Sequence, residues 1–226
     1  LVKASSVLVL TDGAGVKLVR VIGRDDAQEF DPFLMLDAFD IDDPEDYLKG
    51  FPWHPHRGIE TVTYLIEGEI EHGDSLGNTG TIYGGGCQWM TAGSGIIHQE
   101  MPQRSDLMLG TQLWVNLPQK DKMTHPAYRD ITIDQVPVIQ EEGTEVRVIS
   151  GSYNGVDGPV FGDYVKTLYL DVKLDAGTEF RSPITWQFSG NDILQTRLLG
   201  GGTIRGERTW VPLRDVGTYD EWVMES

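Results

Sequence analysis

Four side chains in the sequence have the types and the spacing of metal ligands. His54 and His56 stand two residues apart in the segment HPHRGIETVTYLIEG, and His98 and Glu100 stand two residues apart in AGSGIIHQEMP. Because side chains at positions i and i+2 of a β-strand point to the same face, each pair projects together. Three imidazoles and one carboxylate suit a divalent ion of Fe, Mn, Ni, Cu or Zn. On a six-coordinate ion they would leave positions open for O2 or an oxygen-bearing substrate.

Glu60 is a rival for the carboxylate ligand. It follows His56 by four residues, so a regular strand would turn both side chains to one face. Gly58 lies between them, and a glycine within a strand often marks a bulge that breaks this register. We therefore expect Glu100 to be the ligand. Glu60 is expected to pair elsewhere, with Arg57 or as an acceptor for the N–H of a ligand imidazole.

Three further residues have simpler interpretations. Cys87 is a soft ligand type, but a free cysteine is usually a small, buried apolar residue. His72 is expected at the surface near the end of a strand, and His125 in a linker, both without a role in a site. The sequence contains five histidines and none lies beyond His125, which excludes a second histidine metal site in the C-terminal part.

Short β-strands are the elements expected to position these side chains. β-Branched runs recur along the chain between Gly- and Asn-rich segments, as is typical of an all-β sandwich or barrel. The runs are SVLVLT, VKLVRVIG, ETVTYLIEGEIEHG, GTIYGG, GTQLWVNL, TEVRVIS and VKTLYLDVKL. We interpret the Asp-rich segment 25–49 as an exposed loop or a short helical turn. We expect a metal-binding domain over residues 1–117, a Pro-containing, charged connection over 118–144 and a second domain over 145–226.

The composition of the chain limits its partners. Its 226 residues carry a formal charge of −17, which disfavours direct binding to nucleic acid and to an anionic membrane. A single cysteine cannot form an intrachain disulfide, and nothing in the sequence indicates an oxidising compartment. The sequence has no long uncharged apolar run and no signal-peptide pattern. We expect a cytoplasmic protein.

The sequence resembles the pirin family of the cupin superfamily from about Arg20 to Pro183. The resemblance rests on the blocks IGRDDAQEFDPFLMLDAFD, FPWHPHRGIETVTYLIEGEIEHGDSLGNTG, QWMTAGSGIIHQEMP, GTQLWVNLP and TLYLDVKLDAGTEF. It implies a bicupin, in which two double-stranded β-helix barrels pack face to face. It also implies one mononuclear metal, usually iron, in the N-terminal barrel. The family's four ligands match His54, His56, His98 and Glu100.

Two departures from the pirin pattern stand out. The family usually has Gly-Asp where this chain has Gly86-Cys87, at a turn near the mouth of the pocket. After Pro183 the chain has no match to the family pattern. We therefore expect a C-terminal barrel that is shortened or atypical.

The resemblance implies a metal-dependent dioxygenase of the quercetinase type. Such an enzyme cleaves the flavonol C2–C3 bond with O2 and releases carbon monoxide. The expected partners are thus a flavonol-like aromatic substrate and O2, with Fe(II) as the first choice of metal and Mn, Ni, Cu or Zn as alternatives. Glu100, the only ionisable group among the ligands that is not an imidazole, is a candidate to accept the substrate hydroxyl proton.

Two other functions remain open. Animal relatives are linked to nuclear transcription regulation, which suggests an iron-dependent regulatory protein that acts through protein–protein contacts. A barrel that binds a small acid or sugar, with a purely structural metal, is a third hypothesis. Open coordination positions on the metal count against it.

Overall fold

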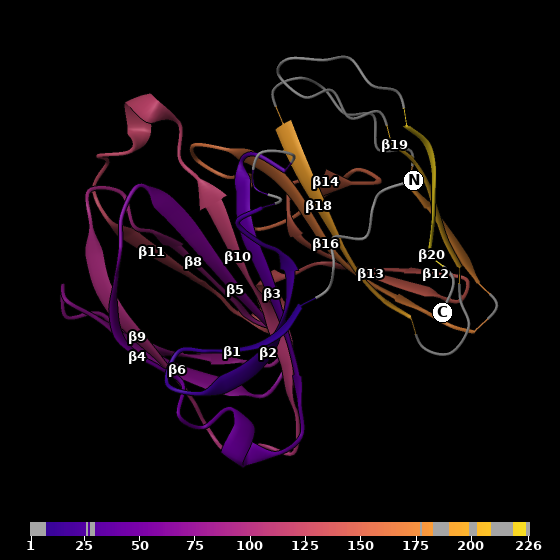
Figure 1. Ribbon diagram of the computed structural model, residues 1–226. Coiled ribbons are helices and arrows are strands. Elements are labelled where there is room, and N and C mark those ends of the chain that lie inside the picture. The colour runs from indigo at the N-terminus through magenta and orange to yellow at the C-terminus, as the bar shows by residue number, and fades with distance from the viewer. Residues whose placement is uncertain are drawn as a thin grey trace. The chain divides into compact units, whose positions relative to one another are not determined.

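The computed structural model describes residues 8–25, 27, 30–176, 178–182, 190–198, 203–208 and 219–224. These residues form β-strands with three short 3-10 helices, and no α-helix occurs among them, which confirms the expected all-β fold (Figure 1). The chain divides into two compact units between Asp134 and Gln135. In the described residues, none of the helices has the length and apolar composition needed to span a membrane.

The first unit consists of two sheets. The larger sheet has seven strands in the order β1-β2-β3-β10-β5-β8-β11. Their bounds are Leu8–Asp12, Val16–Ile22, Phe33–Ile41, Met108–Asn116, Ile59–Glu67, Cys87–Thr91 and Ala127–Ile131. The smaller sheet has the order β4-β9-β6-β7, with bounds Phe51–His56, Ile96–Pro102, Glu69–Asp74 and Thr79–Tyr83. The 3-10 helices span Pro44–Asp46, Gln119–Asp121 and Ile133–Gln135.

Two apolar clusters join the sheets of this unit at different levels. Leu65 of β5 packs in one cluster with Ile70 of β6 and Ile82 of β7, so the two sheets face each other. Ile59 of β5 packs in the other cluster with Ile96 of β9. Between these levels, the strands place polar residues on the same inward faces. These polar residues are Thr61 and Thr63 on β5, Gln88 on β8, His98 and Glu100 on β9, and Gln112 on β10.

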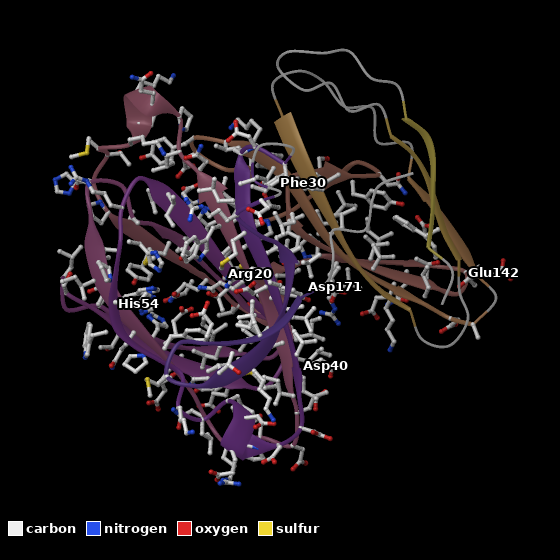
Figure 2. All side chains as sticks on the ribbon, in the orientation of Figure 1. Arg20, Phe30, Asp40, His54, Glu142 and Asp171 are labelled. Atoms are coloured by element: carbon white, nitrogen blue, oxygen red, sulfur yellow. The ribbon has the colours of Figure 1, made fainter. Side chains whose placement is uncertain are left out.

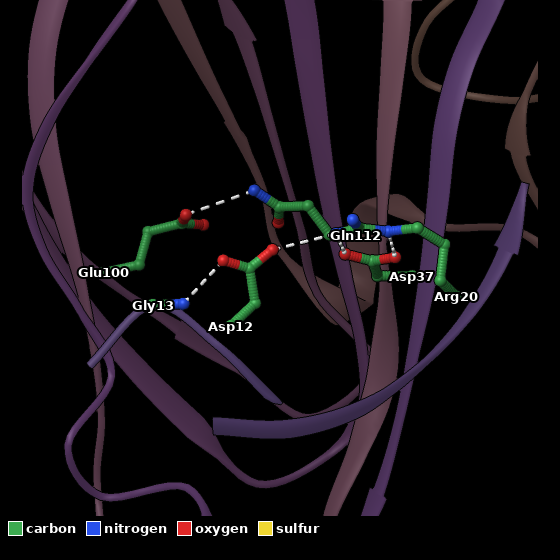
Figure 3. A network of polar contacts seen from close by, with 6 residues as sticks. All are labelled: Asp12, Gly13, Arg20, Asp37, Glu100 and Gln112. Atoms are coloured by element: carbon green, nitrogen blue, oxygen red, sulfur yellow. Dashed lines mark hydrogen bonds and ion pairs between the residues drawn. The ribbon is translucent and has the colours of Figure 1, made fainter. Parts of the chain in front are cut away.

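The segment expected to be a loop contains a strand. β3 covers Phe33–Ile41 within residues 25–49, although Pro44–Asp46 forms the short helical turn that the sequence indicated. The aspartates of this segment made it look solvated, but Asp37 is buried. Its carboxylate accepts two hydrogen bonds of 2.8 Å from the guanidinium of Arg20 on β2 (Figure 3). This paired charge allows an acidic residue to occupy the middle of a sheet.

The second unit is also built from strands. Its four-stranded sheet has the order β12-β13-β16-β18, with bounds Val138–Glu141, Thr144–Ser150, Lys166–Leu174 and Gly190–Leu198. β14 (Ser152–Tyr153) pairs with β15 (Val156–Asp157), and β17 (Glu179–Ser182), β19 (Thr203–Arg208) and β20 (Tyr219–Met224) form a third sheet. β18 pairs in parallel with β16, whereas β13 pairs with β16 antiparallel. The tail after Pro183 is described only in β18, β19 and β20.

The expected connection is divided between the two units. Within residues 118–144, β11 pairs with β8 of the first unit and β12 pairs with β13 of the second. We propose that the first domain extends to about residue 134, where the two units divide. In the stretch before that point, β11 forms an edge strand of the larger sheet.

Candidate metal centre

Strand pairing brings the two ligand pairs together. β4 and β9 are antiparallel neighbours, and His54 lies directly opposite His98 in their ladder. Residues opposite each other in a ladder project to the same face of the sheet, so both side chains point inward. His56 and Glu100 share that face because each is two residues from one of these histidines. Figure 2 shows His54 among the side chains of this unit.

The three imidazoles converge on one point. One nitrogen from each of His54, His56 and His98 lies within 4.8 Å of the other two. The Nε2 atoms of His54 and His56 are 3.1 Å apart. Two nitrogens bonded to one ion at about 2.1 Å and at a right angle lie about 3.0 Å apart, so this spacing is that of neighbouring ligands on an octahedral ion.

Hydrogen bonding orients the ring of His54, and burial keeps the rings of His56 and His98 in the form that binds a metal. Nδ1 of His54 donates a hydrogen bond of 2.8 Å to the carbonyl of Pro52, which leaves the Nε2 lone pair available. Burial, together with the neighbouring imidazoles, lowers the pKa of His56 to about 4 and that of His98 to about 3. Both rings are therefore neutral at neutral pH, and neutral imidazole is the metal-binding form.

His98 provides the test of whether these residues fit a metal ion. Its side chain has no solvent exposure, and neither ring nitrogen has a hydrogen-bond partner. A buried polar atom without a partner is costly, and native proteins rarely leave one unsatisfied. A metal ion at the point where the three rings converge would satisfy one of these nitrogens. The donor set and its geometry thus fit a divalent ion of the Fe, Mn, Ni, Cu or Zn type.

Glu100 lies beside this triad. Its Oε2 is 3.9 Å from Nε2 of His98, and its side chain is buried. The amide of Gln112 donates to Oε2 at 3.1 Å (Figure 3). The hydroxyl of Thr63 donates to Oε1 at 2.8 Å. These two donors fix the carboxylate on the side of the triad formed by His98. The compact nitrogen cluster contains the three histidines without Glu100, so its role as the fourth ligand remains a proposal.

Comparison with known proteins places the chain in a family. The family model described as Pirin matches residues 15–115. A Pseudomonas aeruginosa protein provisionally named quercetin 2,3-dioxygenase is 46% identical over 204 residues, which cover 88% of this chain and 70% of that protein. The chain belongs to the pirin family. This confirms the resemblance, and the two facing sheets of the first unit agree with the cupin barrel expected of a pirin.

Other relatives and solved structures agree with the pirin assignment. A pirin-like protein of Caulobacter vibrioides is 53% identical over 177 residues, which cover 77% of this chain and 64% of that relative. The chain thus spans less than two thirds of the length of this relative. The crystal structure of a quercetin 2,3-dioxygenase from Acinetobacter baumannii superimposes with a TM-score of 0.60 at 37% identity. The superposition covers 67% of this chain and 56% of the Acinetobacter baumannii chain.

The structure separates the two candidate carboxylates of this pirin. Gly58 adopts a φ of +71°, a conformation that favours glycine, between the end of β4 and the start of β5. β4 and β5 belong to different sheets, so no continuous strand carries the inward register from His56 to Glu60. Glu60 points to the face of β5 opposite to Thr63, and Thr91 donates to its Oε1 at 2.7 Å.

His72 is not a surface residue, contrary to the sequence-based expectation. It is 5% exposed and lies directly opposite Glu100 in the ladder between β6 and β9. The GDSLG segment that follows His72 indicates a strand end, but β6 continues to Asp74, so His72 lies inside the strand on its inward face. His125 is exposed outside the strands, as expected of a linker. Cys87 is buried, and burial raises the pKa of its thiol, so it stays protonated.

Thr63 and Gln112 were not singled out from the sequence. Both lie in runs that read simply as apolar strands, TVTYL and TQLWV. The only signal is that polar residues alternate with apolar ones there, although these strands are buried on both faces. Alternation within a fully buried strand indicates a polar site inside the protein, because polar side chains in such a position need partners.

Proposed function

We propose that this protein is a metal-dependent dioxygenase of the quercetinase type, which cleaves the flavonol C2–C3 bond with O2 and releases carbon monoxide. The observation that carries the proposal is the convergence of three imidazoles inside the barrel. Three protein nitrogens, with or without Glu100, leave coordination positions open, which is typical of a catalytic rather than a structural centre. The similarity to a quercetin 2,3-dioxygenase of known structure supports the choice of substrate class.

The overall reaction balances without a further reactant. C3 of the flavonol leaves as carbon monoxide, so its bonds to C2 and C4 both break. The two atoms of O2 remain on C2 and C4, and the organic product is an ester. A divalent redox metal would supply Lewis acidity for the ionised 3-hydroxyl and one-electron chemistry with O2. The protein holds the reactants in one orientation and excludes bulk water.

Glu100 is the residue proposed to handle the substrate proton. A flavonol binds through oxygen once its 3-hydroxyl has lost a proton, and Oε2 of Glu100 is the carboxylate oxygen nearest His98. Thr63 and Gln112 each donate a hydrogen bond to this carboxylate. The hydrogen bonds from Thr63 and Gln112 hold the carboxylate in a fixed position, as a positioned acid–base group requires.

Turnover of quercetin tests the proposed function. Protein reconstituted anaerobically with Fe(II) is expected to consume O2 and release carbon monoxide in equal amounts when quercetin and air are added. Metal-free protein is the control, and Mn, Ni, Cu and Zn are loaded in parallel to rank the metals. A fully loaded protein that neither takes up O2 nor releases carbon monoxide with any of these metals would contradict the proposal. It would favour the metal-dependent regulatory protein instead.

A further inference from the structure

Unsatisfied polar atoms continue beyond the imidazole triad. In the part of the chain that the structure describes, both ring nitrogens of His72, Nε1 of Trp114 and the hydroxyl of Tyr128 are buried without a hydrogen-bond partner. Nε2 of His72 is 3.6 Å from a carboxylate oxygen of Asp130, which is beyond hydrogen-bond distance. Such atoms are rare in native proteins, so several in one region indicate that a ligand or ordered water completes them.

Strand register places these residues side by side around the inside of the barrel. Trp114, Thr61, Met90 and Tyr128 lie opposite one another in turn across β10, β5, β8 and β11, so their side chains share the inward face. At one end of this row, the indole of Trp114 meets the ring of His56 edge-on, with 4.9 Å between centroids.

His72 lies at the other end of this row of side chains, next to Tyr128. It stacks on Tyr128 with 5.7 Å between ring centroids and 11° between planes. It also lies opposite Glu100, which connects it to the metal centre. Gly80 on β7 makes this position of His72 possible, because a Cβ atom at residue 80 would lie 2.5 Å from Nε2 of His72.

The chemistry of these groups defines the ligand that they would bind. The indole N–H can only donate, so the ligand must offer it an acceptor such as oxygen. Burial, and to a smaller extent the nearby acidic groups, raise the pKa of Tyr128. Its phenol therefore stays protonated and can donate or accept a hydrogen bond. The indole, the phenol and the His72 ring are flat, and flat walls favour a planar aromatic ligand.

We propose that Trp114, Tyr128 and His72 form a subsite for the hydroxyl groups of a polyhydroxylated planar aromatic ligand whose other oxygens lie at the metal centre. The proposal rests on the proposed function for the metal-facing end of the ligand. It adds that the hydroxyl groups remote from the metal are recognised by hydrogen bonds.

Binding of two flavonols tests the subsite. Quercetin carries hydroxyl groups on all its rings, whereas 3-hydroxyflavone keeps the metal-binding oxygens and lacks the others. The dissociation constants of both are measured by fluorescence quenching, without O2, on Fe(II)-loaded protein. Tyr128→Phe is expected to weaken quercetin binding by about 2–10-fold, the usual effect of one hydrogen bond, and to leave 3-hydroxyflavone binding unchanged. Tyr83→Phe, at an exposed tyrosine of β7, is the matched control and should change neither constant.

The outcomes separate the subsite from the activity. Equal effects of Tyr128→Phe on the two flavonols, or no effect on either, would overturn the subsite. Failure of the wild-type protein to bind either flavonol would overturn it as well. If Tyr128→Phe weakens the binding of quercetin alone and the wild-type protein consumes no O2, the subsite is supported and the proposed activity is overturned. Metal content and the unfolding temperature of each variant are measured first, and His72→Gln provides a second variant if Tyr128→Phe does not fold.

Discussion

Replacing His98 with alanine is expected to abolish metal binding and, with it, any dioxygenase activity. His98 is opposite His54 in the β4–β9 ladder, and its ring is fully buried. Neither ring nitrogen has a partner in the protein, so the ring has no structural hydrogen bond that would explain its position. Loss of a direct ligand should cost more affinity than the roughly 10–100-fold typical of losing a residue that only supports a ligand.

Two histidines serve as controls for this substitution. His125→Ala removes an exposed imidazole outside the strands and should leave both metal affinity and activity unchanged. His72→Ala removes a buried imidazole outside the triad and should leave metal binding intact, although flavonol binding is expected to weaken. Metal affinity is measured by titrating Fe(II) into each apo variant under anaerobic conditions. Wild-type affinity in the His98 variant would mean that the centre is assigned wrongly.

The isosteric change Glu100→Gln is expected to weaken Fe(II) binding by more than about 100-fold, and Glu60→Gln by less than about 3-fold. Glu100 is buried, and its Oε2 lies 3.9 Å from Nε2 of His98. Its two carboxylate oxygens accept hydrogen bonds from Thr63 and Gln112. An amide there would lose the charge that favours a cation. Glu60 is equally buried, but it lies on the opposite face of β5 and accepts from Thr91.

The pair of variants makes a matched comparison because each replaces a buried glutamate with its amide. Isothermal titration of Fe(II) into the two apo proteins gives the affinities directly. Weaker binding by Glu60→Gln than by Glu100→Gln would show that the ligand assignment is wrong. Equal, small effects of both variants would mean that the centre is held by the three histidines alone.

Side-chain alternation along single strands could be predicted from the sequence. His54 and His56, or His98 and Glu100, share a face because a strand repeats every two residues. Gly58 indicates a break in register between His56 and Glu60, and the structure has one there, although it separates two strands of different sheets instead of forming a bulge within one strand. These conclusions depend only on local backbone geometry, which neighbouring residues largely determine.

Pairing between distant strands could not be predicted in the same way. Nothing near His72 in the sequence indicates that β6 lies beside β9, with His72 opposite Glu100. Similarly, Asp37 reads as a solvated residue until Arg20 is placed next to it by the β2–β3 ladder. In both cases a polar residue is buried because a partner or site lies on another strand, and that information is in the tertiary structure alone.

Anomalous diffraction from crystals of the Fe(II)-reconstituted protein would test the central claim most directly. We expect one iron peak per chain, in the first unit, at about 2 Å from one nitrogen each of His54, His56 and His98. Glu100 is expected as the fourth protein ligand. The absence of a peak, a second peak in the same chain, or a peak held by other side chains would contradict the account.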